Sequence, residues 1–417
     1  MSPILPFDII ALIIDIVGGN KDTNLLKELA LVSHCFHQIC IKHLFATVEL
    51  QDIDRDYHVV ASSKKGFVRL LRSRPDVVNY IRKLTYNFQS SRLSPTHPNF
   101  NNEDHLVSSI LSNHLRTISR LNCLTITASQ LDWNELDSSL TSAFLYLMNL
   151  PSLEHIDLSY IQDFPLFSFT PSVNLHRLDI SYLRRFDRPE EDGSPDKAEI
   201  VVQSETMPQI REFHTSGSPL LTMKLLHAKM QDGRPAFNLM DLRRLSTCLE
   251  DERNIRYVLQ NAKLLEKLHL SVASGGSRQS LVKLHEILSP TARALKVLDV
   301  TVSIYDCVPL PLGGLCEGLE AIAGNMLEAL SFEVQVDDHE TEDSIGSEVQ
   351  RVEKVLIKSG WSALRQVSFK VTIACWGNSA QLYEALQSLP DKYLSHLSKL
   401  ESVALSFSVD IFKCIIL

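Results

Sequence analysis

The chain has 417 residues, of which 44% are hydrophobic, and it carries a formal net charge of −9 with a pI near 5.9. It is too long for one ordinary domain, so we expect a small domain joined to a large one or to a repeat array. The acidic balance and the lack of any basic run longer than two residues argue against nucleic-acid binding, which requires a concentrated basic surface.

Three short helices are expected in residues 5–45. Pro6 fits the first turn of the first helix, where its missing N–H costs nothing, and Gly18-Gly19 should end that helix through a left-handed cap. Asp22 or Thr23 can cap the second helix and Ser33 the third. Apolar residues recur at three- and four-residue intervals: Ile9, Ile10, Ile13, Ile14 and Val17, then Leu25, Leu26 and Leu29, then Phe36, Ile39, Cys40 and Leu44.

These apolar side chains have two interpretations. Three short helices cannot bury so many large aliphatic groups among themselves, and a surplus exposed patch usually marks a partner surface. Alternatively, the helices cap the following domain and every isoleucine belongs to the core. The spacing alone favours neither interpretation.

The specific residues at the start of the chain favour the interpretation that the apolar patch binds a partner. The chain begins with Leu5-Pro6, and the second helix runs on as Leu29-Ala30-Leu31-Val32-Ser33-His34-Cys35-Phe36. This stretch closely resembles an F-box, the helical module that docks onto a Skp-family adaptor in a cullin-based ubiquitin ligase. The resemblance covers about the first tenth of the chain. It implies adaptor binding through Leu5, Pro6, Ile9, Ile10, Ile13, Leu29, Val32 and Phe36.

A second pattern follows residue 75, where a phrase of the form apolar-x-x-apolar-x-apolar recurs. The ten copies begin at Ile81, Leu121, Leu153, Leu175, Ile210, Leu265, Leu295, Leu327, Leu364 and Leu400. A degenerate copy is expected around Leu239-Met-Asp-Leu242. The helix-like segments between the copies are residues 108–119, 138–150, 251–261, 280–288, 347–359 and 380–396.

A repeated strand followed by a helix is typical of a leucine-rich-repeat solenoid, with parallel inner strands and outer helices. The phrases resemble the divergent repeats of F-box proteins with leucine-rich-repeat domains. We therefore expect an α/β fold with an F-box in residues 1–50, linker helices in 51–80 and an irregular solenoid in 81–417. An ordinary α/β domain with a parallel sheet is the alternative.

The strand positions between the apolar ones should line the concave face, where Asp157, Asp179 and Asp299 are candidate target-binding residues. Trp133 and Trp376 follow strand phrases and are candidate anchors. A solvated strand face and tryptophans packed within their own repeats explain the same residues without a partner. Polar insertions follow several strand phrases, and such loops can also capture a partner.

The C-terminal Cys414-Ile415-Ile416-Leu417 fits a prenylation box, and its terminal leucine indicates a geranylgeranyl group. Only Lys413 is basic nearby, so membrane association depends on prenylation of Cys414. The alternative is that this segment is the apolar end of a strand. The eight scattered cysteines, together with the absence of a signal sequence, predict free thiols in a cytoplasmic or nuclear protein.

Catalytic motifs are absent from the sequence. Gly313-Gly314 and Gly318 lack the lysine of a phosphate loop, and neither a Gly-x-Ser-x-Gly elbow nor a His-Glu-x-x-His helix occurs. We expect no enzyme activity, cofactor or metal. The predicted function is that of a substrate receptor in a Skp–cullin–F-box ligase, whose protein target the sequence does not identify. The alternative is a scaffold with a leucine-rich-repeat surface that joins no ligase.

Overall fold

The computed structural model is an α/β protein in which two compact units are distinguished. The first unit comprises Met1–Pro208 and His227–Phe237, and the second comprises Gln209–Leu226 and Asn238–Leu417. The structure describes residues 7–20, 22–51, 62–88, 102–169, 171–183, 201–202, 207–248, 252–272, 284–288, 294–303, 315–322, 326–337, 342–358, 360–375 and 380–413.

Three helices open the first unit: α1 (Phe7–Gly19), α2 (Thr23–Val32) and α3 (His34–Leu44). The expected caps are present, because the Asp22 carboxylate accepts the Leu25 N–H at 3.0 Å and the Ser33 hydroxyl accepts the Phe36 N–H at 3.3 Å. The helices enclose a shared core formed by Ile14, Leu26, Ile39 and Cys40. One apolar side of each helix is thus used to hold the three together.

Gly18 lies inside α1, which ends at Gly19, and its role differs from the one expected. The backbone at Gly18 and Gly19 does not have positive φ, so the left-handed cap predicted from the sequence was wrong. A Cβ atom built on Gly18 would lie 2.3 Å from Nδ1 of His43, whereas one built on Gly19 meets nothing within 4 Å. The missing side chain of Gly18 therefore lets the His43 ring of α3 approach α1.

The main sheet strands of the first unit are parallel and lie in the order β2-β1-β3-β4-β5-β6. Their bounds are β1 (Thr47–Gln51), β2 (Ser62–Ser63), β3 (Lys83–Phe88), β4 (Cys123–Asp132), β5 (His155–Gln162) and β6 (Arg177–Ser181). The remaining elements are α4 (Lys64–Ser73), η1 (Pro75–Tyr80), α5 (Asn102–Leu115), η3 (Trp133–Glu135) and α6 (Ser138–Met148), with a small sheet that pairs β7 (Val201–Val202) with β9 (Lys229–Met230).

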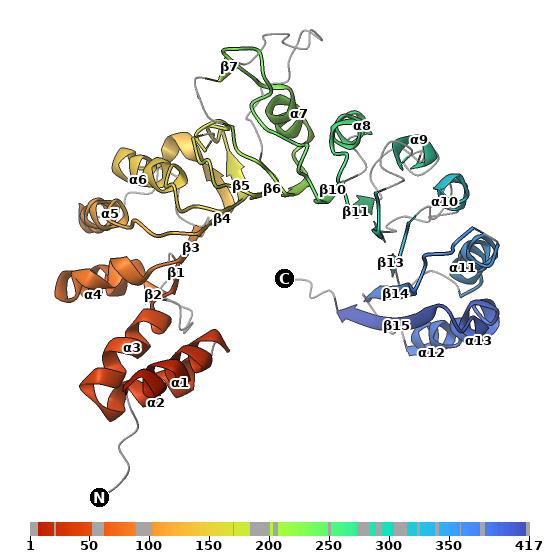
Figure 1. Ribbon diagram of the computed structural model, residues 1–417, viewed down its shortest axis with the longest axis horizontal. Helices are drawn as coiled ribbons and strands as arrows, with labels where there is room; N and C mark the ends of the chain where they lie inside the picture. The colour runs from red at the N-terminus through yellow and green to blue at the C-terminus, as the bar shows by residue number, and fades with distance from the viewer. Residues whose placement is uncertain are drawn as a thin grey trace, which may run out of the picture. The chain divides into compact units, whose positions relative to one another are not determined.

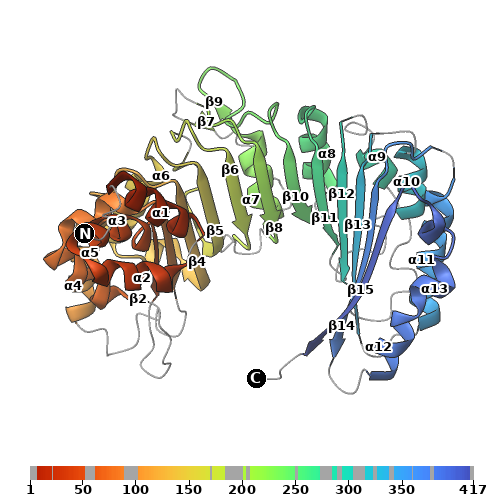
Figure 2. The same ribbon diagram turned by 60° about the horizontal axis from the view of Figure 1, so that its bottom comes forward.

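The second unit repeats this parallel arrangement in the order β8-β10-β11-β12-β13-β14-β15. Its strands are β8 (Glu212–Ser216), β10 (Arg244–Cys248), β11 (Lys267–Val272), β12 (Val297–Ser303), β13 (Ala329–Asp337), β14 (Gln366–Cys375) and β15 (Ala404–Lys413). Its helices are α7 (Pro219–His227), α8 (Glu252–Asn261), α9 (Leu284–Leu288), α10 (Leu315–Ile322), α11 (Glu342–Leu356), α12 (Ala380–Gln387), α13 (Leu389–Tyr393) and η5 (Leu397–Lys399). In the first unit α4, α5 and α6 lie along one side of the strands, whereas α1–α3 lie beyond β2; in the second unit the helices lie along one side (Figure 1, Figure 2).

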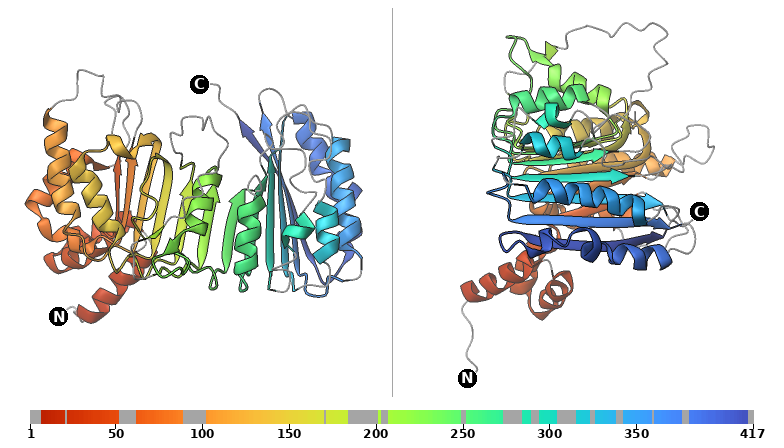
Figure 3. Two further views of the ribbon diagram at one scale, coloured as in Figure 1. Left: turned by 90° about the horizontal axis from the view of Figure 1, so that it is seen from above. Right: turned by 90° about the vertical axis from the view of Figure 1, so that its right-hand side faces the viewer.

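The repeated phrase explains the register. In the first unit Leu84, Leu124, Ile156 and Leu178 lie opposite one another on adjacent strands, and all four are buried. All ten copies of the phrase lie at strands, which Figure 3 shows side by side in each unit. The degenerate copy is β10, which begins two residues after the predicted Leu242. The coarse prediction of alternating helices and parallel strands is confirmed.

Candidate functional site

Helix α1 has a second apolar side that nothing in the described chain covers. Successive helical residues turn by about 100°, which places Ile9, Ile13 and Ile16 on one side and the core-facing residues on another. The exposed fractions are 43% for Ile9, 46% for Ile13 and 57% for Ile16. Leu12, on the same side, is 56% exposed. A helix that is apolar on both sides is normally buried, whereas this side of α1 is exposed among the described residues.

Helix α2 extends the exposed apolar character. Val32 is 66% exposed and Leu25 is 38% exposed, although Leu26 of the same helix is buried in the core. Leu31 is the most exposed, at 87%. We use the term N-terminal apolar surface for the following set: Ile9, Leu12, Ile13, Ile16, Leu25, Leu31 and Val32.

The residues implied by the F-box resemblance divide into three groups. Ile9, Ile13 and Val32 are exposed on the N-terminal apolar surface. Ile10, Leu29 and Phe36 are partly buried and pack against the helical core, whereas Leu5 and Pro6 lie outside the described residues. The sequence interpretation omitted Leu12, Ile16, Leu25 and Leu31 from the surface, although the helical intervals that place Ile9 and Ile13 there also apply to Leu12 and Ile16.

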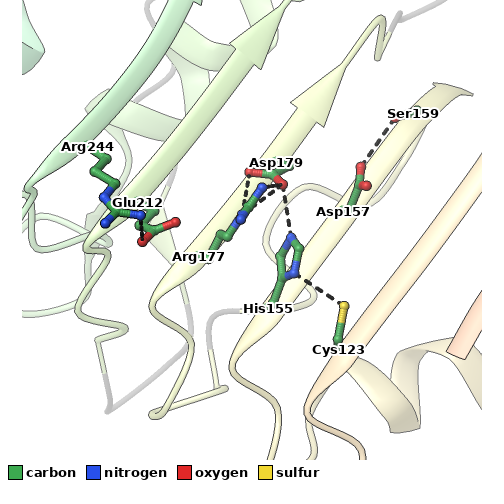
Figure 4. A network of polar contacts seen from close by, with 8 residues as sticks. All are labelled: Cys123, His155, Asp157, Ser159, Arg177, Asp179, Glu212 and Arg244. Atoms are coloured by element: carbon green, nitrogen blue, oxygen red, sulfur yellow. Dashed lines mark hydrogen bonds and ion pairs between the residues drawn. The ribbon is translucent and has the colours of Figure 1, made fainter. Parts of the chain in front are cut away.

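The strand face of the first unit carries a network of polar contacts rather than free carboxylates (Figure 4). Asp179 is only 8% exposed, and its Oδ2 accepts hydrogen bonds from Arg177 Nη2 at 2.9 Å and Nε at 3.0 Å. The same oxygen lies 2.9 Å from His155 Nε2. Asp157, one strand away, accepts a hydrogen bond from the Ser159 hydroxyl at 3.3 Å. Asp179 is therefore occupied within the sheet.

The groups of this network shift one another's pKa values. Burial alone would lower the pKa of His155, but the hydrogen bonds to Asp179 and Cys123 outweigh it and raise that pKa to about 9. Burial would raise the pKa of Asp179, but the hydrogen bonds from His155 and Arg177 hold it below its usual value. His155 is consequently a cation at neutral pH.

Of the other candidate target-binding residues, some form contacts within the fold and the rest lie outside the described residues. Asp299 forms an ion pair with Lys267 of the neighbouring strand at 2.8 Å. Trp133 is buried and packs edge-on against Phe164, so it belongs to the core of its own repeat. Trp376 and Cys414 lie outside the described residues. Asp299 and Trp133 therefore need no partner to explain them: Asp299 is paired on the strand face, and Trp133 is packed within its own repeat.

Two tyrosines that the sequence analysis did not single out project from the first unit. Tyr160 is 43% exposed and Tyr182 is 38% exposed, and their rings stack with centroids 4.7 Å apart and planes 9° from parallel. Both have a left-handed backbone, with φ of 59° at Tyr160 and 51° at Tyr182. A bulky residue rarely adopts this conformation.

The left-handed backbone is what exposes the two rings. On β5 the buried positions are Ile156 and Leu158, so regular alternation would bury Tyr160 as well. Instead Tyr160 is exposed and Ile161 is buried. The same reversal occurs at the end of β6, where Tyr182 is exposed and Leu183 is buried. The same strained backbone thus occurs near the end of β5 and directly after β6, at a cost of about 1–2 kcal/mol per residue, and each displays an aromatic ring.

The chain matches no protein-family model, and a search of curated proteins gives no significant match. None of the described helices has the length and apolar character required to cross a membrane. Within the described ranges, no group of three or more His, Cys, Asp or Glu side chains is arranged to hold a metal ion.

Proposed function

We propose that this chain is the substrate-recognition subunit of a Skp–cullin–F-box ubiquitin ligase. In this proposal α1–α3 form an F-box that binds a Skp-family adaptor and, through it, a cullin. The parallel strands and helices of the two units form an irregular leucine-rich-repeat solenoid that holds the target protein. The protein would act in the cytoplasm or nucleus.

The observation that supports this proposal most directly is the N-terminal apolar surface. Its seven side chains are between 38% and 87% exposed, although other side chains of the same helices form a closed core. Burying a half-exposed leucine or isoleucine against a partner contributes roughly 1 kcal/mol at about 25 cal/mol per Å². An adaptor that covers several of these residues would therefore gain substantial binding free energy.

The stacked tyrosines support a target-binding role for the first unit. Tyrosine is enriched at the centres of protein interfaces because a large rigid ring is ordered at little entropic cost. The rings of Tyr160 and Tyr182 stack on each other, which limits their movement. In a ligase, other enzymes would transfer ubiquitin to the target, and this chain would contribute only by holding the target close to them.

A scaffold that joins no ligase is the second candidate. It would use the strand faces for binding and would require no adaptor. The cross-strand ion pairs on the second unit, such as Lys267 with Asp299 and Lys370 with Glu333 at 3.0 Å, are compatible with a simple solvated surface there. The two candidates differ in whether the N-terminal apolar surface binds an adaptor.

Co-purification of the tagged full chain with a Skp-family adaptor and cullin distinguishes them. The test variant is Ile9→Asp/Ile13→Asp, which places charges on the exposed side of α1. The control is Leu264→Asp, since Leu264 is 48% exposed in the second unit. The proposal requires that wild type and control retain the adaptor and that the double variant lose it. Equal recovery from all three chains, or none from any, would reject the proposal.

A further inference from the structure

Helix α4 and the segment that follows α5 carry a concentration of positive charge that the acidic composition of the whole chain conceals. Between residues 57 and 131 the acidic residues are Asp76, Glu103 and Asp104. The basic residues of the same stretch are Lys64, Lys65, Arg69, Arg72, Arg74, Arg82, Lys83, Arg92, Arg116 and Arg120. This stretch is therefore cationic within a chain whose net charge is −9.

Four of these arginines have no partner among the described residues. Arg69, Arg72, Arg116 and Arg120 are exposed, and within the described part of the chain none of their side chains forms a hydrogen bond or an ion pair. Arg74 differs, because its guanidinium is held by the Asp76 carboxylate at 3.0 Å. We use the term basic surface for the four unpaired arginines.

The fold brings the basic surface together from two neighbouring helices. α4 and α5 pack side by side along the strands (Figure 1). Arg69 and Arg72 are three residues apart and so share one side of α4. His114 lies in the last turn of α5, where burial and the nearby charge of Arg72 lower its pKa. Arg116 follows His114 by two residues, so the two helices contribute to one region.

The helix dipole explains only part of this arrangement. It favours a cation in the last turn of a helix, which accounts for Arg72 at the end of α4. Arg69 lies one turn earlier and Arg120 lies beyond the end of α5, so the dipole accounts for neither. Like charges gathered in one region repel one another, and an anion bound among them would remove that repulsion.

We propose that the basic surface binds an acidic segment of a partner protein, rich in Asp and Glu side chains. The planar guanidinium of arginine pairs with a carboxylate through two parallel hydrogen bonds, which suits such a segment. The surface is confined to two helices of an acidic chain, so it fits a short anionic stretch better than a long polyanion. The inference does not depend on adaptor binding by the N-terminal apolar surface.

Two other anionic partners fit the surface less well. The described residues of α4 and α5 expose no large apolar side chain, so a membrane would gain no inserted group there. They also expose no aromatic ring, and proteins that bind single-stranded nucleic acid use such rings to stack the bases. Carboxylates therefore match what the surface offers, which is charge and hydrogen-bond donors alone.

The experiment measures binding of a fluorescein-labelled poly-glutamate peptide of about ten residues to the purified full chain, without adaptor, by fluorescence anisotropy at about 50 mM salt, where surface charges are weakly screened. The test variant is Arg72→Ala/Arg116→Ala. The control is Arg211→Ala/Lys263→Ala, which removes the same charge from exposed positions of the second unit. Because both variants change the net charge equally, a difference between them reports where the charge lies.

We expect the control to bind the peptide within about twofold of wild type and the test variant to bind at least about fivefold more weakly. Arg72→Lys/Arg116→Lys keeps both charges and should stay within about threefold of wild type. The inference is overturned if wild type shows no saturable binding, or if the test and control variants are weakened equally. It is also overturned if a labelled poly-uridine of the same length binds more tightly than the peptide, since the surface would then select nucleic acid.

Discussion

The rings of Tyr160 and Tyr182 are stacked 4.7 Å apart, and each tyrosine itself has a left-handed backbone, Tyr160 within β5 and Tyr182 directly after β6. Asparagine adopts this backbone more readily than tyrosine. Replacing both tyrosines should therefore relieve backbone strain while removing the exposed aromatic pair.

We expect Tyr160→Asn/Tyr182→Asn to retain the wild-type free energy of unfolding within about 1 kcal/mol, because relief of strain offsets the lost stacking. Capture of targets should nevertheless fall. The measurement is quantitative mass spectrometry of proteins that co-purify with the chain after proteasome inhibition, and Tyr146→Ala, which alters an exposed tyrosine on α6, is the control. A set of captured proteins identical to that of wild type would refute the role of the tyrosine pair.

Gly18 and Gly19 form a natural matched pair for testing the helical trio. A Cβ at position 18 would collide with His43, displacing a ring whose Nε2 contacts Asp15 Oδ1 at 2.7 Å. We expect Gly18→Ala to destabilise the packing of α1 on α3 by about 1–3 kcal/mol. Gly19→Ala meets no neighbour, so it should be neutral or stabilising by up to about 1 kcal/mol. Chemical denaturation, combined with hydrogen exchange in α1, measures both, and equal effects would contradict the close approach of His43.

The His155 network predicts a specific dependence of stability on pH. The folded pKa of about 9 exceeds the ordinary value of 6.5, so the contribution of His155 is complete below about pH 6.5 and is lost as pH rises towards 9. The lowered pKa of Asp179 acts at the other end, because its contribution is lost as pH falls below about 4. The network therefore stabilises the fold most between about pH 4 and about pH 6.5.

Denaturation of wild type and His155→Asn across this range measures the effect. The stability advantage of wild type should decrease between pH 6.5 and 9 by an amount on the order of 3 kcal/mol, at about 1.4 kcal/mol per pKa unit. The control is His34→Asn, which changes an exposed imidazole on α3. A pH-independent difference between wild type and His155→Asn would show that His155 does not gain its charge through this network.

The strands of the fold could be predicted because each copy of the phrase begins with a residue that the repeat buries. Leu121, Leu153 and Leu265 are fully buried, and the strand follows within two residues. β1 and β2 were not predicted, since neither carries the phrase. Leu400 also shows the limit of the pattern, because it is 37% exposed where β15 has only β14 as a neighbour among the described strands.

The candidate sites were predictable only where one helix or strand determines them. The spacing of Ile9 and Ile13 predicted that they share one side of a helix, but it did not decide whether that side is exposed or buried. Asp179 depends on which residues the register brings beside it, and sequence alone does not provide those neighbours. Tyr160 occupies a position that strand alternation assigns to the core, and only its positive φ reverses that assignment.

The measurement that tests the central claim most directly is the dissociation constant of the purified chain for a purified Skp-family adaptor. Wild type should bind with a dissociation constant of about 1 μM or tighter. Val32→Asp should weaken binding by at least about tenfold, because it would bury a charge in an apolar contact. The absence of saturable binding by wild type, or equal affinity of wild type and Val32→Asp, would contradict the assignment of the N-terminal apolar surface as an adaptor-binding site.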